Sequence, residues 1–397
     1  MNKKIIFLIP TLSLGGGERV VSELSLNLPE SIEKVIVLFK KEISYPYKGR
    51  IISLDIPLPL KSSFLKVYHY FFGLLKFKKI ITSEKPDYVV SFGHPANIMN
   101  ILSRLGVFAS RTTLATSGSR AIVRVDNFYS SSLPGFSGSI YKFLIKILFN
   151  RAEAIVDVSK ESARDLVEHF GVRENKIKVI YNPLNIKEIE RLAKEPLSES
   201  HQAIFKNPVI INMGRLNLQK GQKYLIGSFA KIKKKVKNAK LVILGKGELE
   251  DSLRDLSEKA GLKDDIYFLG WQANPFKFLA RSKIFALSSL WEGLPYVVLE
   301  AMACALPIVS FDCKSGPREI LSPDGDFSHQ AKDIEYAEYG VLVNPGDEDM
   351  LSQAVVKMLS DDHVLERYKE KSKKRAIEFD IKNIIQEWEF LQENGKN

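Results

Sequence analysis

The sequence predicts an α/β protein with two doubly wound parallel-sheet domains, one in each half of the chain. Short β-branched, apolar runs alternate with helical patterns throughout, which is the order of elements in parallel sheets. A glycine-bearing turn follows the first predicted strand of each half, where the strand passes into a helix. The 397 residues are enough for two such domains, each with its own core.

The first half begins with a strand at residues 4–9, followed by Gly15, Gly16 and Gly17 and a helical stripe from residue 20 to 28. Glycines at such a turn let backbone approach a ligand closely and present amides to an anion, although loops also use glycine freely. The predicted first domain ends at residue 183. Its further strands are predicted at residues 34–39, 88–92, 112–116, 154–158 and 175–181.

The second half follows a polar stretch, residues 184–207, that we interpret as the interdomain connection. The second domain is predicted at residues 208–378, and residues 379–397 hold a final helix with an apolar stripe. The strands of this domain are predicted at residues 208–213, 240–244, 266–270, 283–287, 308–312 and 339–343.

The turn after residue 213 carries Gly214 and Arg215, and Lys220 follows five positions later, ahead of a helix. Two cations at a strand-to-helix turn suit a diphosphate. Ordinary loop cations are the alternative interpretation.

A longer pattern, residues 288–320, runs from a buried strand through a polar loop into a helix and on to another strand. Pro295 stands where a first helical residue is expected, since a missing N–H costs nothing there. Glu292 lies in the loop and Glu300 in the helix. Carboxylates beside a helix N-terminus suit a ligand with sugar hydroxyls next to a diphosphate. A solvated loop Glu and a helix-surface Glu are the other interpretation.

The sequence of residues 288–320 resembles that of retaining family 4 glycosyltransferases of the GT-B fold. The resemblance rests on Glu-Gly-Leu-Pro, on Leu-Glu-Ala-Met-Ala with its Glu eight positions after the first, on Ala-Leu-Pro-Ile-Val and on Ser-Gly-Pro-Arg-Glu-Ile. It implies two Rossmann-like domains facing a central cleft, with the last helix crossing back to the first domain.

The resemblance also implies the roles of particular residues. Glu292 would hold the donor sugar and Glu300 the ribose, while Arg215 and Lys220 would bind the donor diphosphate. The expected catalytic residues are Glu292, Arg215, Lys220 and His94. The expected donor-binding residues are Gly15, Gly16, Gly17, Gly214, Arg215, Lys220, Glu292, Gly293, Leu294 and Glu300.

The acceptor side is less defined by the sequence. His94 follows a first-domain strand and suits a sugar or acceptor hydroxyl, although a lone His is more often structural. Some members of the resembled family carry a His in the loop that we align with residues 116–120, and this chain has none there. Arg120 and Arg124 are candidates for an acceptor phosphate or, equally, ordinary surface cations.

The charge is concentrated in the first half. Residues 1–183 contain 26 Lys and Arg against 15 Asp and Glu, whereas the remaining residues contain 32 of each. This excess predicts an anionic partner for the first half. Aromatic and lysine residues alternate at 64–80 and again at 137–151, which suits helices lying on an anionic bilayer; core helices with outward-pointing lysines are the alternative.

The sequence therefore predicts a retaining transferase that uses a nucleotide sugar, expected to be a UDP-sugar, and a membrane-bound, anionic, lipid-linked acceptor. We expect a cytoplasmic protein at the inner face of the cell membrane, with no nucleic-acid partner. Asp324 and Asp326 form an Asp-x-Asp pattern of the kind that holds a metal in other glycosyltransferases, but they lie in a Gly/Pro loop that we interpret as a turn. Neither a metal nor another cofactor is therefore expected. The alternatives are a GT-B nucleotide-sugar epimerase or glycoside phosphorylase, and a non-catalytic protein that binds anionic surfaces.

Overall fold

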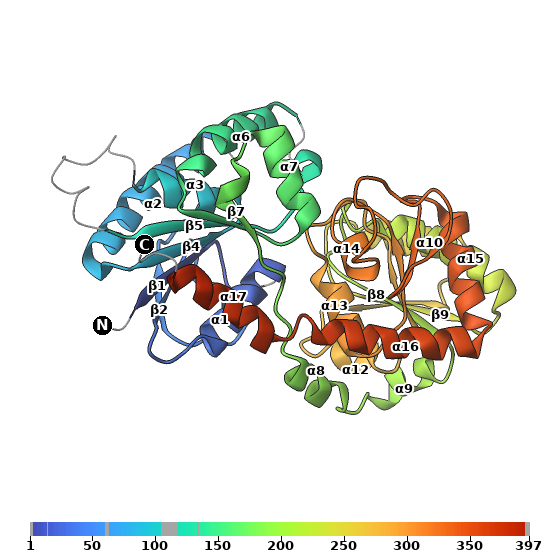
Figure 1. Cartoon of the computed structure of the whole chain (residues 1–397). Coiled ribbons are helices and arrows are strands. Elements are labelled where there is room, and N and C mark those ends of the chain that lie inside the picture. Colours follow the sequence, from blue (N-terminus) through green and yellow to red (C-terminus); the bar gives the residue numbers. More distant parts are fainter. Residues whose placement is uncertain (1–2, 14, 60–62, 105–117, 133–134, 394–397) are drawn as a thin grey trace. The chain divides into compact units, whose positions relative to one another are not determined.

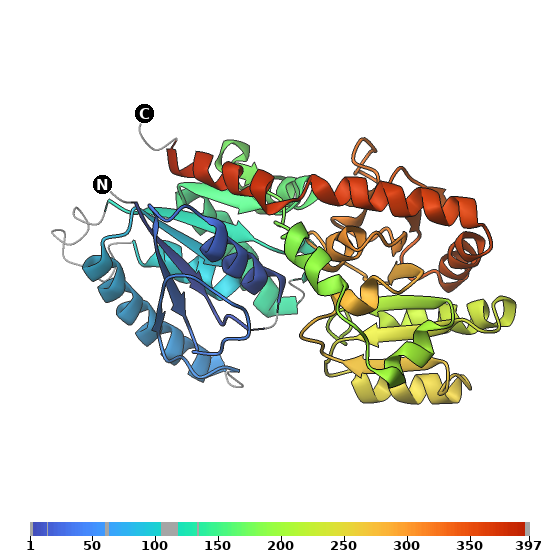
Figure 2. The same cartoon turned by 90° about the horizontal axis from the view of Figure 1, so that it is seen from below.

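The computed structural model describes residues 3–13, 15–59, 63–104, 118–132 and 135–393. The chain divides into two compact units, which we call unit 1 and unit 2. Unit 1 comprises residues 1–183 and 381–397, and unit 2 comprises residues 184–380. Both units are α/β, with helices packed on the faces of a sheet (Figures 1 and 2).

The described part of unit 1 holds a seven-stranded sheet in the order β3-β2-β1-β4-β5-β6-β7, and every neighbouring pair is parallel. Helices α2, α3 and α6 cover one face, and α1 and α17 lie on the other (Figure 1). The elements of unit 1 are β1 (Lys4–Ile9), α1 (Gly16–Asn27), β2 (Glu33–Leu38), β3 (Arg50–Ser53), α2 (Ser63–Glu84), β4 (Tyr88–Phe92), α3 (His94–Leu102), β5 (Arg120–Val125), α5 (Tyr129–Ser132), α6 (Gly135–Leu148), η2 (Phe149–Arg151), β6 (Ala154–Asp157), α7 (Lys160–Phe170), η3 (Glu174–Lys176), β7 (Ile177–Val179) and α17 (Ile381–Glu393).

The central strands of unit 1 form because they are apolar on both faces. In β1 every residue from Ile5 to Ile9 is buried, as expected for a strand covered by helices on both sides. One face packs against Leu74 and Phe77 of α2. Further along the sheet the core contains Ile145 and Leu148 of α6.

Unit 2 repeats this arrangement with the strand order β10-β9-β8-β11-β12-β14-β13 in its described residues. All neighbouring pairs are parallel except β13 with β14. Its elements are α8 (Ile186–Ala193), α9 (Glu199–Phe205), β8 (Val209–Met213), α10 (Gln222–Lys235), β9 (Lys240–Leu244), α11 (Glu250–Lys259), β10 (Ile266–Gly270), α12 (Phe276–Leu279), β11 (Ile284–Leu287), α13 (Tyr296–Ala303), β12 (Ile308–Phe311), α14 (Pro317–Leu321), β13 (Glu335–Tyr336), β14 (Val341–Val343), α15 (Glu348–Leu359) and α16 (Asp362–Ile377).

The α/β prediction with two parallel sheets is confirmed, and some individual strands need comment. The strand expected at residues 112–116 lies outside the described residues, and the strand that follows α3 in the described chain is β5. Strands β3 and β13 were not predicted, because each is short and lies at a sheet edge with partly exposed side chains. Pro295 is the N-cap of α13, one position earlier than expected.

The stretch 184–207, expected to be a polar connection, contains helices α8 and α9 and belongs to unit 2. Each helix has a side-chain N-cap that the polar composition hides: Asn185 accepts from the amide of Glu188, and Ser198 accepts from that of His201. Helix α17 groups with unit 1 and packs against α1.

Candidate functional site

The topology of unit 2 brings the loops after β8 and β11 to one place. Strands β9 and β10 extend the sheet to one side of β8, and β11 and β12 extend it to the other. Doubly wound sheets bind ligands at the carboxyl ends of the strands where the order reverses. Arg215 follows β8 and Glu292 follows β11, so the fold places both predicted residues at this edge.

Lys220 and Glu292 form an ion pair at the same edge. The Nζ of Lys220 lies 2.6 Å from Oε1 of Glu292, and their side chains are 18% and 7% exposed. A buried carboxylate needs such a partner, because desolvation without one is costly. Two predicted site residues that are 72 positions apart are thus in direct contact.

Backbone contacts hold the two loops that carry this pair. The amide of Leu290 donates to the carbonyl of Gln219 at 2.8 Å, and Ser288 Oγ donates to the carbonyl of Lys220 at 2.9 Å. Gly221 adopts the left-handed conformation, with φ 59° and ψ 27°, where a side chain would also collide with the carbonyl of Ser288. The glycine therefore permits the close approach that positions Lys220.

The loop after β9 supports Arg215. The amide of Leu216 donates to the carbonyl of Lys246 at 3.0 Å. A Cβ on Gly245 would collide with the carbonyl of Gly214, and one on Gly247 with the carbonyl of Leu216. The sequence analysis missed this support, for which the only signal was a second glycine pair after a strand. The Arg215 side chain itself is exposed.

The Ser-Gly-Pro-Arg-Glu-Ile segment holds the loop of Glu292 from the other side. The amide of Glu292 donates to the carbonyl of Lys314 at 2.8 Å, and Ser315 Oγ donates to the carbonyl of Gly293 at 2.8 Å. Gly316 has φ 94°, and a side chain there would press into Gly293 and Pro295. This contact explains in physical terms why the two parts of the motif occur together.

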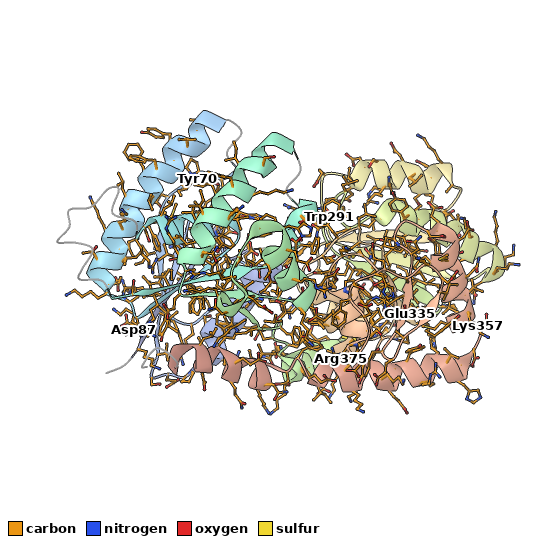
Figure 3. All side chains as sticks on the ribbon, turned by 45° about the horizontal axis from the view of Figure 1, so that its top comes forward. Tyr70, Asp87, Trp291, Glu335, Lys357 and Arg375 are labelled. Atoms are coloured by element: carbon orange, nitrogen blue, oxygen red, sulfur yellow. The ribbon has the colours of Figure 1, made fainter. Side chains whose placement is uncertain are left out.

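Arg318, in the same segment, joins two carboxylates. Its Nη2 lies 2.5 Å from Oδ2 of Asp312 and 2.7 Å from Oε2 of Glu335, which is labelled in Figure 3. Burial raises the pKa of Asp312, and the Arg318 guanidinium opposes that rise. Arg318 is a positioning residue for α14 and its loops that the sequence analysis did not single out.

The remaining predicted donor residues lie on α13 or directly before it. Gly293 and Leu294 are buried in the loop, and Glu300 is 4% exposed within the helix. Glu300 is therefore not a surface carboxylate. Burial raises the pKa of Cys304, one turn further on, and the nearby charge of Glu300 adds to this rise.

Unit 1 has an equivalent reversal of strand order between β1 and β4. Gly15, Gly16 and Gly17 follow β1, and His94 follows β4, so these predicted residues share one sheet edge. The carboxylate of Glu18 folds back over Gly15 and fills the space that a side chain on Gly15 would need. An anion approaching these amides would therefore meet Glu18.

His94 begins α3 and stacks on Tyr129, with ring centroids 4.2 Å apart and an interplanar angle of 34°. Burial lowers the pKa of His94 to about 4. The imidazole is therefore neutral at pH 7 and is not a cation there.

The structure corrects the two arginine predictions. Arg120 is the first residue of β5, at the amino edge, where its Nη1 donates to the hydroxyl of Tyr88 at 3.4 Å. A strand of this length separates it from the His94 edge by about 16 Å. Arg124 is fully buried, 2.6 Å from Oδ1 of Asn182 and 2.9 Å from Oδ1 of Asp126, so it is not a surface cation.

The described part of the loop compared with the family's His loop precedes β5. Residues 116 and 117 lie outside the described residues, and residues 118–120 lead into β5 at its amino end. The carboxyl end of β5 is followed by Asp126. The absence of His at 116–120 therefore carries no information about the carboxyl edge.

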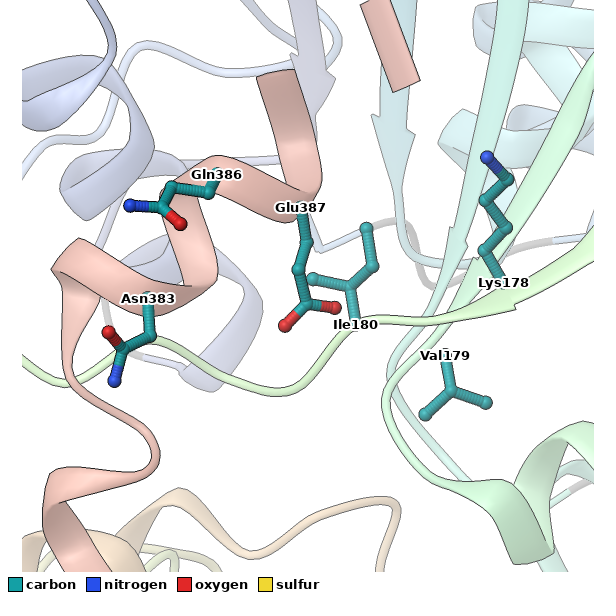
Figure 4. A pocket seen from close by; sticks show the side chains of 6 residues that line it. All are labelled: Lys178, Val179, Ile180, Asn383, Gln386 and Glu387. Atoms are coloured by element: carbon teal, nitrogen blue, oxygen red, sulfur yellow. The ribbon is translucent and has the colours of Figure 1, made fainter. Parts of the chain in front are cut away.

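One cavity of about 520 Å³ lies in unit 1 between β7 and α17 (Figure 4). None of the predicted site residues lines it. Burial raises the pKa of Glu387 on its wall. Its lining residues are Lys178, Val179, Ile180, Asn383, Gln386 and Glu387.

The described residues contain no cluster of three or more His, Cys, Asp or Glu residues suited to a metal ion. None of their helices combines the length and the apolar character needed to cross a bilayer.

The two doubly wound sheets, each with loop glycines and polar residues at its strand-order reversal, define an α/β protein of the GT-B fold. Family models agree: "Glycosyltransferase Family 4" matches residues 14–188 and "Glycosyl transferases group 1" matches residues 193–375. The chain belongs to the family 4 glycosyltransferases.

Individual relatives support this membership. An uncharacterized glycosyltransferase of Methanocaldococcus jannaschii is 37% identical, over 80% of this chain and 82% of its own. The N-acetylgalactosamine-N,N'-diacetylbacillosaminyl-diphospho-undecaprenol 4-alpha-N-acetylgalactosaminyltransferase of Campylobacter jejuni is 30% identical, over 97% and 98%. The fold is similar to that of Anabaena HepE, crystallised with UDP and glucose, with a TM-score of 0.77 at 18% identity over 99% of this chain and 100% of that chain.

Proposed function

We propose that this glycosyltransferase moves a sugar from a UDP-sugar to a glycan linked to a membrane-borne polyprenyl diphosphate, with retention of the anomeric configuration. The observation that carries the proposal is the buried Lys220–Glu292 pair beside Arg215 at the strand-order reversal of unit 2. The name of the Campylobacter relative supports the acceptor class, and the UDP bound by Anabaena HepE supports the base.

In the proposed reaction the bond between C1 of the sugar and the diphosphate oxygen breaks, and the electron pair leaves with UDP. An acceptor hydroxyl oxygen bonds to C1 on the same face, and its proton passes to an oxygen of the departing diphosphate. Arg215 and Lys220 stabilise the negative charge of the leaving diphosphate, which is the task a metal performs in other enzymes. Glu292 accepts hydrogen bonds from the sugar hydroxyls, and Glu300 from the ribose.

The Lys220–Glu292 contact gives this scheme a ligand-dependent step. Without donor, the ammonium group of Lys220 neutralises Glu292. A diphosphate would compete for the same ammonium group, while the sugar hydroxyls would satisfy the carboxylate. Donor binding thus exchanges one buried set of charge-assisted hydrogen bonds for another, which favours a complete UDP-sugar over UDP alone.

We further propose that unit 1 contacts the membrane through α2 and α6. Both helices expose large apolar side chains while Leu74 and Ile145 face the core. Tyr141 of α6 contributes to the raised pKa of Tyr70 on α2, after burial, which indicates that the two helices are close (Figure 3). The exposed apolar residues are Leu65, Val67, Tyr68, Phe71, Phe72, Ile140, Phe143 and Ile147, and exposed lysines among them are Lys76, Lys79, Lys142 and Lys146.

The transfer activity is tested with purified protein, a panel of labelled UDP-sugars and a short-chain polyprenyl-diphosphate glycan. We expect transfer from at least one donor, unchanged by EDTA, and loss of donor binding in Glu300→Ala. The anomeric configuration of the product is read by NMR. Conversion of the donor in the absence of acceptor would support an epimerase, and transfer to inorganic phosphate a phosphorylase; either result contradicts the proposal.

The membrane surface is tested by flotation with vesicles containing anionic lipid. The double variant Phe72→Ser/Phe143→Ser should lose flotation while its melting temperature stays near that of the wild type, because both side chains are exposed. The matched control Leu256→Ser removes an exposed apolar side chain from α11 of unit 2 and should float normally. Equal flotation of all three proteins would contradict this surface, and stronger binding to DNA than to vesicles would reject the membrane partner.

A further inference from the structure

The carboxyl end of β5 carries one charged side chain that the sequence analysis did not consider. Asp126 directly follows β5, which pairs with β4, whose carboxyl end leads to His94. Its side chain keeps 27% of its surface exposed, whereas Arg124 and Asp157, the charged residues beside it, are fully buried. Of these three, Asp126 alone presents a charge to solvent at this edge.

The two oxygens of Asp126 have different surroundings. Oδ1 lies 2.9 Å from Nε of Arg124. Oδ2 faces the glycine loop after β1, since a Cβ built on Gly17 would lie 3.3 Å from it. Asp126 is also close to Tyr129, whose pKa it helps to raise, and His94 stacks on the same ring.

The neighbours of Asp126 are held rigidly. Nη2 of Arg124 donates to Asn182, and the guanidinium lies over the ring of Phe92, with its carbon 5.5 Å from the ring centroid. Asp157 accepts hydrogen bonds from the amide of Ser159 and the hydroxyl of Ser162. These contacts fix the backbone at the ends of β5 and β6, so the Asp126 carboxylate has a defined position.

We infer that Asp126 is the carboxylate with which unit 1 binds a hydroxyl group of the acceptor sugar, an inference that rests on the proposed function. A carboxylate fixed on one oxygen by an arginine offers its other oxygen to a sugar hydroxyl as a charge-assisted acceptor. Gly17 leaves the space beside that oxygen open, and neutral His94 provides a second polar group at the same sheet edge. Burial raises the pKa of Asp126, and the Arg124 guanidinium opposes this rise.

The test compares Asp126→Asn with Asp55→Asn, an exposed carboxylate that follows β3 in the same unit. Transfer is followed with a UDP-sugar and a short-chain polyprenyl-diphosphate glycan, and UDP binding is measured by calorimetry. For Asp126→Asn we expect kcat/KM for the acceptor to fall by about 10- to 150-fold, the effect of one charged hydrogen bond. The Kd of UDP should stay within about twofold of the wild type, and Asp55→Asn should match the wild type in both measurements.

A set of deoxy acceptors identifies the hydroxyl. The acceptor lacking the hydroxyl bound by Asp126 should be as poor with the wild type as the full acceptor is with Asp126→Asn, and the two losses should not add. If Asp126→Asn is unstable because Arg124 loses its partner, Asp126→Glu keeps the charge and should raise the acceptor KM several-fold at an unchanged melting temperature.

The outcomes separate this inference from the proposed function. Absence of transfer by the wild type with every donor would reject the proposed function and this inference with it. Transfer by the wild type together with an unaltered acceptor kcat/KM in both Asp126 variants would overturn the inference alone. Equal loss of UDP binding and transfer in a folded Asp126→Asn would assign Asp126 to the donor and also overturn it.

Discussion

The Lys220–Glu292 pair allows a test in which its two members respond in opposite ways. Lys220→Met keeps most of the side-chain volume and removes the cation, so UDP loses one charge-assisted hydrogen bond. Glu292→Gln removes the carboxylate, which frees the ammonium group from the 2.6 Å contact that it makes without ligand. UDP lacks the donor sugar that Glu292 is proposed to bind, so its affinity should not fall in the second variant.

The magnitude follows from the burial of the pair. With side chains 18% and 7% exposed, water screens the contact little, and a hydrogen bond to a charged group is worth about 1.5–3 kcal/mol. The Kd of UDP should therefore rise by about 10- to 150-fold in Lys220→Met and stay equal or fall in Glu292→Gln. In Glu292→Gln the UDP-sugar should lose its advantage over UDP.

Isothermal titration calorimetry with UDP and with the UDP-sugar measures both effects. Lys234→Met, which changes an exposed lysine on α10, the helix that follows the Lys220 loop, is the matched control and should bind like the wild type. A fall in UDP affinity of the same size in Lys220→Met and Glu292→Gln would refute the reasoning, because the pair would then only stabilise the loops.

Three further predictions concern stability. Arg318→Met leaves the carboxylates of Asp312 and Glu335 without their cation, so the free energy of unfolding of unit 2 in urea should fall by about 3–5 kcal/mol; a change below 1 kcal/mol would contradict this. Gly221→Ala should lower the free energy of unfolding by at least about 1–2 kcal/mol, since the left-handed backbone alone costs that much. The control Gly261→Ala changes an exposed glycine that also has a left-handed backbone but has no atom within 4 Å of the added Cβ, so it should lose the backbone contribution alone. His94 is buried in its neutral form, so between about pH 6.5 and 4 the unfolded chain binds a proton at this residue that the folded chain does not. The free energy of unfolding should therefore fall by about 1.4 kcal/mol for each pH unit as the pH drops through this range. In His94→Gln, urea denaturation at several pH values should show this pH dependence reduced by one proton.

The sequence predicts most of the fold because its signals are local. A buried parallel strand is a continuous apolar run, so β1 and β9 appear at their correct positions. Strand β5 contains Arg124, and a charge within an apolar run argues against a strand unless its burial is known. The partners that make this arginine tolerable, Asn182 and Trp388, come from distant segments.

The sequence likewise predicts some of the site residues and misses the contacts that position them. The cations and carboxylates of unit 2 are found from the sequence because the motif is long, and the structure brings Lys220 and Glu292 into contact. The packing that positions them, through Gly245, Gly247 and Ser315, depends on backbone atoms of other loops and leaves only weak glycine signals. In unit 1 strand β5 was not predicted, so nothing in the sequence indicated that Asp126 lies at the carboxyl end of a strand.

Part of the basic excess of the first half is paired with carboxylates. At the amino edge, Lys4 and Arg50 are neutralised by Glu84, at 3.2 Å and 2.5 Å. Exposed lysines remain on α2 and α6, next to Phe72 and Phe143. A nucleic acid would use the lysines and leave these rings in water, whereas an anionic bilayer takes up both the charge and the apolar surface. The pairing of the two side-chain types on the same helices therefore favours a lipid surface, which is also where a polyprenyl-linked acceptor resides.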